Sequence, residues 1–179
     1  MKKKTRGKKI LIGAAAILAA AGIFLFGFFF VQNPWFDAWM RAQFGDDLFD
    51  FSEFTVEEDE AQTLEEVIAK YEPVFMSLQD TALERLEELY QSAAAEYRSE
   101  KTAGTLDRFQ LTNKYLQAGR LLEKTVDEAF YSLLEGMEKE LKSKNLPTFI
   151  VTDIEAAYIE AKEEKKESLF KRARETVGF

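Results

Sequence analysis

The longest apolar stretch of the chain covers residues 10–31, where 22 consecutive positions carry no charged side chain. A helix of this length spans roughly 33 Å at about 1.5 Å per residue, close to the roughly 30 Å hydrocarbon core of a bilayer. Cleavage as a signal peptide is disfavoured, because signal cores are shorter, about 7–15 residues, and cleavage would leave an exposed apolar end. The pattern therefore predicts an uncleaved transmembrane helix at residues 10–31.

Charge is distributed unequally on the two sides of this predicted span. Residues 1–9 contain six basic side chains and no acidic one, whereas four aspartates lie between residues 37 and 50. Basic flanks of a transmembrane helix remain cytoplasmic. We therefore expect a single-pass protein of the plasma (inner) membrane, with residues 1–9 as a cytoplasmic basic tip and residues 32–179 extracytoplasmic.

A short helix is predicted over residues 32–45, directly after the span. Pro34 suits the first turn of a helix, and Gly45 is a natural end. Trp35 and Trp39 lie four positions apart and therefore share one face of this helix. Because tryptophan is enriched in the headgroup region of membranes, we interpret both side chains as membrane-interface residues in contact with lipid.

Residues 46–62 fit no helical stripe, because large apolar side chains are interleaved with acidic ones. One interpretation is a linker whose aromatic side chains pack onto the following domain. The other is a docking segment for a protein partner at the outer face of the membrane, since an acidic, aromatic strip fits a basic, apolar groove. The candidate docking residues are Leu48, Phe49, Phe51 and Phe54.

Two long helices with regular apolar stripes are predicted next. The first begins at a capping box formed by Thr63 and Glu66, continues past a bend at Pro73 and ends at Gly104. The second ends before Pro147 and is expected to be the best buried. Steps of three or four place the stripe residues on one face of each helix. They are Leu64, Ile68, Tyr71, Phe75, Leu78, Ala82, Leu86, Leu89, Ala93 and Tyr97, then Leu111, Tyr115, Ala118, Leu122, Val126, Ala129, Leu133, Met137 and Leu141, widened by Phe109, Leu116, Phe130 and Leu134.

A third amphipathic helix is predicted to start at a second capping box, formed by Thr152 and Glu155. Charged residues at 162–167 interrupt its stripe, so the helix is expected either to leave the core there or to lay the methylene chain of Lys165 along it. The predicted fold class is all-α. One N-terminal transmembrane helix is followed by an extracytoplasmic helical domain at 63–179, either an antiparallel three-helix bundle or a long helical hairpin that dimerises.

Composition narrows the chemistry that this domain can perform. The 179 residues include no cysteine and no histidine, which excludes disulfides and thiolate metal sites and removes the commonest general base. When the six basic residues of the N-terminal tip are set apart, 18 of the 24 basic side chains remain against 32 acidic ones, a net charge of −14. That charge disfavours nucleic acid as a partner. No catalytic residue, cofactor or metal ligand is predicted.

The pattern favours a membrane-anchored scaffold or protein-binding module of the cell envelope, which binds a protein partner outside the membrane or assembles as a homo-oligomer. An alternative is an extracytoplasmic sensor, in which Tyr71, Tyr97, Tyr115 and Tyr158 line a cavity for a small ligand. An envelope enzyme is disfavoured, because no recognisable nucleophile, base and orienting group occur together.

Overall fold

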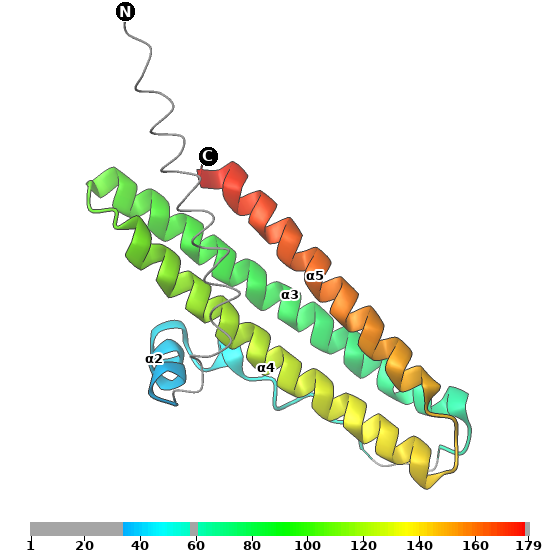
Figure 1. Cartoon of the computed structure of the whole chain (residues 1–179). Helices are drawn as coiled ribbons and strands as arrows, with labels where there is room; N and C mark the ends of the chain where they lie inside the picture. Colours follow the sequence, from blue (N-terminus) through cyan, green and yellow to red (C-terminus); the bar gives the residue numbers. More distant parts are fainter. Residues whose placement is uncertain (1–33, 58–60, 178–179) are drawn as a thin grey trace, which may run out of the picture.

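The computed structural model describes residues 34–57 and 61–177, and helices make up most of this part of the chain (Figure 1). Its elements are α2 (Pro34–Phe44), the 3₁₀ turn η2 (Asp47–Phe49), α3 (Leu64–Ala103), α4 (Arg108–Ser143) and α5 (Phe149–Val177). No strand occurs among the described residues, and the predicted all-helical class is confirmed for them.

α3 and α4 form an antiparallel hairpin, and α5 runs back along it, so the three helices lie side by side (Figure 1). With 40 residues in α3 and 36 in α4, the hairpin is a rod. Its helices are roughly 60 and 54 Å long at about 1.5 Å per residue. The short helix α2 lies against the side of α4 and does not continue the rod.

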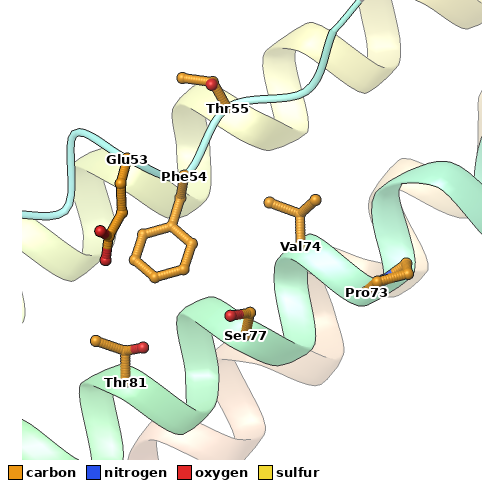
Figure 2. Close-up of a pocket in the computed structure, with 7 residues that line it drawn as sticks. All are labelled: Glu53, Phe54, Thr55, Pro73, Val74, Ser77 and Thr81. Carbon is orange, nitrogen blue, oxygen red and sulfur yellow. The ribbon is translucent and has the colours of Figure 1, made fainter.

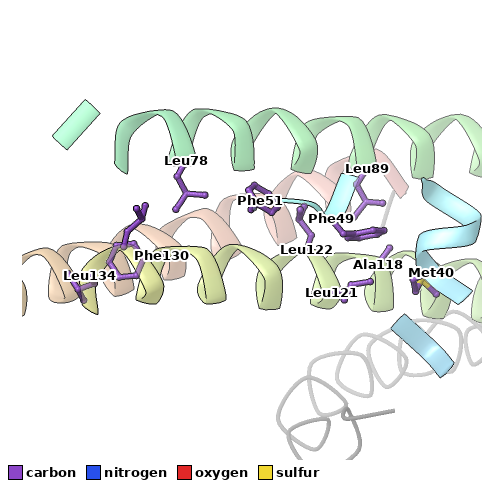
Figure 3. Close-up of a cluster of buried hydrophobic side chains, with 11 residues drawn as sticks. Met40, Phe49, Phe51, Leu78, Leu89, Ala118, Leu121, Leu122, Phe130 and Leu134 are labelled. Carbon is purple, nitrogen blue, oxygen red and sulfur yellow. The ribbon is translucent and has the colours of Figure 1, made fainter. Parts of the chain in front are cut away.

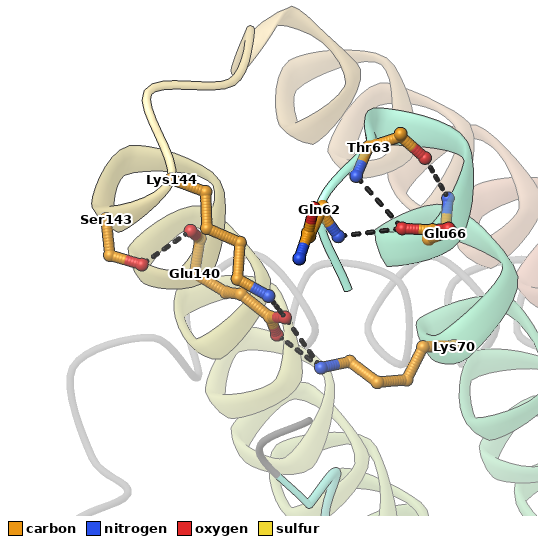
Figure 4. Close-up of polar contacts among 7 residues, drawn as sticks. All are labelled: Gln62, Thr63, Glu66, Lys70, Glu140, Ser143 and Lys144. Carbon is orange, nitrogen blue, oxygen red and sulfur yellow. Dashed lines mark hydrogen bonds and ion pairs between the residues drawn. The ribbon is translucent and has the colours of Figure 1, made fainter. Parts of the chain in front are cut away.

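Both ends of α3 form where local sequence chemistry predicts them. The Thr63 hydroxyl accepts a hydrogen bond from the Glu66 N–H at 3.2 Å, and the Glu66 carboxylate accepts one from the Thr63 N–H at 3.1 Å (Figure 4). At the other end Gly104 adopts φ +72°, a left-handed conformation that costs glycine little. The helix runs without interruption through Pro73, as the unbroken apolar stripe predicts.

The predicted start of the third helix is wrong. α5 begins at Phe149, and Thr152 lies inside its first turns rather than at a cap. The physical reason is tertiary packing: Ile150 and Val151 lie against the buried cluster that contains Met137. Burial of these two side chains stabilises a helical turn ahead of the local capping signal.

The main buried cluster lies between α3 and α4, and α4 supplies most of its residues (Figure 3). Leu122 and Leu133, which the stripe predicts at the centre, are 3% and 4% exposed. A second, smaller cluster forms where the start of α3 and the end of α4 meet the start of α5. The main cluster also includes three residues that precede the bundle, and they are Met40, Phe49 and Phe51.

No helix within residues 34–57 and 61–177 is long and apolar enough to cross a bilayer. The predicted cytoplasmic tip at 1–9 and the predicted span at 10–31 lie outside the described residues.

Candidate partner-docking site

The segment that carries the candidate docking residues runs along the α3–α4 hairpin. Its η2 turn places Phe49 in the core at 1% exposure, where its ring meets that of Phe44 edge-on, with centroids 6.5 Å apart. Phe51 is 6% exposed and lies in the same cluster (Figure 3). Leu48 is half-buried and packs against this cluster. In this conformation Phe49 and Phe51 contribute to folding and present almost no surface to a partner.

Two arginines from the neighbouring helices bind this segment. The Arg85 guanidinium of α3 lies 4.2 Å from the centre of the Phe51 ring and donates a hydrogen bond to the Asp50 carbonyl oxygen. The Arg41 guanidinium of α2 donates to the Phe49 carbonyl oxygen at 3.4 Å. The two hydrogen bonds satisfy backbone carbonyl groups that have no partner within a helix or sheet, because the segment is irregular. The contact of Arg85 with the Phe51 ring is a cation–π interaction. The segment is therefore part of the fold and not a free spacer.

Phe54 marks the place where the segment becomes accessible. Its half-buried ring lies over α3 beside an open groove of about 480 Å³ (Figure 2). The groove is lined by Glu53, Phe54, Thr55, Pro73, Val74, Ser77 and Thr81. An apolar floor with hydroxyl groups and one carboxylate at its edge suits a protein segment better than it suits a compact small molecule.

The helix α2 is fixed on the bundle by three kinds of contact. Met40 is fully buried, the rings of Phe44 and Tyr115 meet edge-on with centroids 5.5 Å apart, and the Lys124 ammonium lies 2.8 Å from the Asp37 carboxylate. Apolar burial provides most of the stabilisation, because a partly exposed ion pair is worth about 0–1 kcal/mol. α2 is thus packed on the bundle as part of the same folded unit.

Of the two tryptophans predicted at the membrane interface, Trp39 is 51% exposed and contacts the ring of Phe36 at 5.8 Å between centroids. The side chain of Trp35 lies outside the described part of the chain.

The prediction that Phe109 widens the apolar stripe of α4 is wrong, because this side chain is 73% exposed. It belongs to the first turn of α4, just after the cap at Asp107, and lies about 200° around the helix from the buried Leu111 at about 100° per residue.

The tyrosines proposed to line a small-ligand cavity contact different partners along the rod. The Tyr158 ring of α5 stacks on Phe130 of α4 at 3.8 Å between centroids, and Tyr71 lies against Phe75 at 6.4 Å. The Tyr115 hydroxyl donates to Glu96 at 2.7 Å. The Tyr97 hydroxyl is buried and has no hydrogen-bond partner among the described residues.

Carboxylates between helices are bound by cations. The Lys70 and Lys144 ammonium groups each lie 2.6 Å from the Glu140 carboxylate, joining α3 to the end of α4 (Figure 4). Burial alone would raise the pKa of Glu140, but the hydrogen bonds from these two lysines outweigh burial and lower that pKa. The carboxylate is therefore held ionised, which suits a structural ion pair and not a general acid.

The charged middle of α5 meets acidic residues of α4. The Lys162 ammonium lies 3.0 Å from the Asp127 carboxylate, and the Lys166 ammonium lies 2.8 Å from the Glu123 carboxylate. Further along, Arg172 binds Glu87 of α3 at 2.8 Å. Ion pairs with α4 and α3 thus hold the C-terminal half of α5, where charged residues interrupt the apolar stripe. The sequence shows the charges but not their partners, which are 35 to 85 positions away for the Lys162–Asp127 and Arg172–Glu87 pairs.

The described residues contain no group of three or more acidic side chains placed to hold a metal ion. Together the fold and these contacts define an all-helical domain with a core rich in leucine and with ion pairs between its helices. Comparison of the chain with protein-family models, with curated proteins and with solved structures finds no match.

Proposed function

We propose that the chain is a membrane-anchored scaffold or protein-binding module of the cell envelope. Residues 10–31 span the plasma membrane with the basic residues 1–9 in the cytoplasm, and the three-helix bundle lies outside. The support is the run of 22 uncharged residues and the charge difference between its two flanks.

The observation that carries the proposal is the packing of α2, the first described helix after the proposed anchor, against the bundle. α2 begins at Pro34, three residues after the apolar run ends at residue 31, and Met40 and Phe44 pack it onto the bundle. A free tether would let the domain sample many orientations. Because α2 is packed on the bundle, only the short stretch at 32–33 separates the proposed span from the packed domain, an arrangement that suits a protein that spaces or positions a partner.

The proposed partner contact is the accessible part of residues 46–56, at the groove beside Phe54. Leu48, Phe49 and Phe51 attach the segment to the bundle, while Glu53 and Thr55 are exposed at the groove. A partner segment with an apolar side chain next to lysine or arginine fits this site. The charge argument is the net −14 of residues 10–179, which attracts basic surfaces over distances comparable to the Debye length.

Membrane topology is tested with protease on intact cells from which any wall has been removed. The proposal expects digestion of the domain while a cytoplasmic control protein stays whole. Protection of the domain, with simultaneous digestion of an extracytoplasmic control, would show that the orientation is wrong.

Partner binding is tested with a photo-crosslinking residue in place of Thr55 in the full chain in native membranes. The matched control places it at Thr152, an exposed threonine of α5. We expect a crosslinked protein from position 55 only, and expect Glu53→Lys to reduce it while Glu160→Lys, a charge reversal on exposed α5 surface, does not. Equal crosslinking from both positions, or none from position 55, would contradict this site.

A further inference from the structure

Two large exposed aromatic side chains lie in one groove of the bundle although 70 positions separate them in the chain. Trp39 comes from α2 and is 51% exposed, and Phe109 comes from the first turn of α4 and is 73% exposed. Both line an open groove of about 450 Å³ with Phe36 and Met40 at its apolar floor. The groove lies where α2 meets the α3–α4 end of the rod.

The polar rim of this groove includes the carboxylates of Glu96, Glu100 and Asp107, and two of them have partners within the domain. The Glu96 carboxylate binds the Lys114 ammonium at 2.7 Å, and the Asp107 carboxylate accepts the N–H groups of Phe109 and Gln110 at the start of α4. Much of the remaining rim consists of amide side chains, which can donate to and accept from headgroup oxygens. These are Gln43, Gln110, Asn113 and Gln117.

Chain length limits how far the groove can be from the proposed anchor. Three residue steps separate position 31 from Pro34, a reach of at most about 11 Å at about 3.6 Å per residue. Trp39 is five residues further along α2, or about 8 Å of helix. Since α2 is packed on the bundle, Phe109 lies beside Trp39 in the same groove and is within a similar reach of the proposed anchor.

We propose that the Trp39–Phe109 groove rests in the headgroup region of the outer leaflet, so that lipid is the second contact between the domain and the membrane. Aromatic rings with adjacent hydrogen-bonding groups favour this region. Two contacts, the anchor and this groove, fix both the position and the tilt of the rod. The inference rests on the proposed transmembrane anchor and adds a lipid-binding surface to it.

The test uses the full chain reconstituted in phosphatidylcholine vesicles, with and without bromine on the acyl chains, which quenches nearby indoles. The chain has two tryptophans, so Trp35→Phe with Trp39→Phe provides a background without indole fluorescence. On that background Phe109→Trp places a single indole in the groove. The matched control is Phe149→Trp, since Phe149 is 61% exposed and starts α5 at the far end of α4.

We expect brominated lipid to quench most of the emission from Phe109→Trp and to leave that of Phe149→Trp unchanged. Resistance of the protein to alkaline extraction from the vesicles reports the anchor separately. An extraction-resistant protein whose Phe109→Trp emission is unaffected by bromine would overturn the inference and leave the anchor standing. A blue-shifted but unquenched emission would also overturn it, because another protein surface would then cover the groove. Release of the protein by alkali would refute the anchor itself.

Discussion

The Arg85 guanidinium carbon lies 4.2 Å from the centre of the Phe51 ring, and the same side chain donates a hydrogen bond to the neighbouring Asp50 carbonyl. A residue in the middle of α3 thereby binds the irregular segment that precedes the helix. Cation–π contacts of this kind contribute about 0.5–2 kcal/mol, and more when water is excluded. The contact explains how a segment rich in acidic residues stays attached to an acidic domain.

Truncating Phe51 should destabilise the bundle. Because this ring is 6% exposed, we expect Phe51→Ala to lower the free energy of unfolding by about 3–5 kcal/mol, as for buried aromatic residues in general. The measurement is denaturant unfolding of the full chain in detergent, followed by circular dichroism. Phe149→Ala, at a residue 61% exposed, is the control and should change the free energy by no more than about 0.5 kcal/mol. Similar losses in the two variants would contradict the proposed attachment of the segment.

The centre of the rod should respond differently from the polar face of α5. Leu122 is 3% exposed, so Leu122→Ala should cost about 2–5 kcal/mol of stability. The Glu163 side chain is 64% exposed and pairs only with Lys166 in the contacts described, so Glu163→Ala should cost no more than about 0.5 kcal/mol. Chemical denaturation of both variants checks this. If Glu163→Ala lowered the free energy of unfolding as much as Leu122→Ala, the result would contradict the observed burial of Leu122 and exposure of Glu163.

Salt should loosen the C-terminal half of α5 selectively. Lys162, Lys166 and Arg172 hold this half through partly exposed ion pairs, and salt screens such pairs. Residues 149–158 are held instead by apolar contacts, including the stack of Tyr158 on Phe130. Hydrogen exchange measured by mass spectrometry at low and high salt should show faster exchange in residues 159–177 only. Equal acceleration along the whole helix would argue against electrostatic attachment.

Acid should weaken the contact between α5 and α3. Hydrogen bonds from Arg172 and then Gln91 lower the pKa of Glu87 from 4.5 to about 2. Between these values the unfolded chain binds a proton at this site that the folded chain does not, so this contribution is complete above about pH 4.5 and is lost as pH falls towards about 2. Thermal unfolding of the native chain and of Arg172→Gln should therefore differ at neutral pH and converge near pH 2. A difference that stays constant through this range would contradict the assigned pair.

The elements that could be predicted from the sequence depend on residues close together in the chain. The capping box of Thr63 and Glu66 and the left-handed Gly104 act within one helical turn, so α3 has the predicted ends. The period of the apolar stripe likewise places Leu122 and Leu133 in the core. Three- and four-residue spacing follows from helix geometry alone, and the tertiary packing buries the face on which these two side chains lie.

Other features depend on contacts between parts of the chain that are far apart in the sequence. The pattern of residues 46–56 allowed both a packed linker and an exposed docking strip, and the contacts of Phe49 and Phe51 with the hairpin place these two rings in the core. The early start of α5 depends on the packing of the partly buried Val151 against the cluster that contains Met137. The spacing of residues along the chain does not determine these contacts. Which of these side chains become buried depends on which faces are still uncovered once the helices are packed.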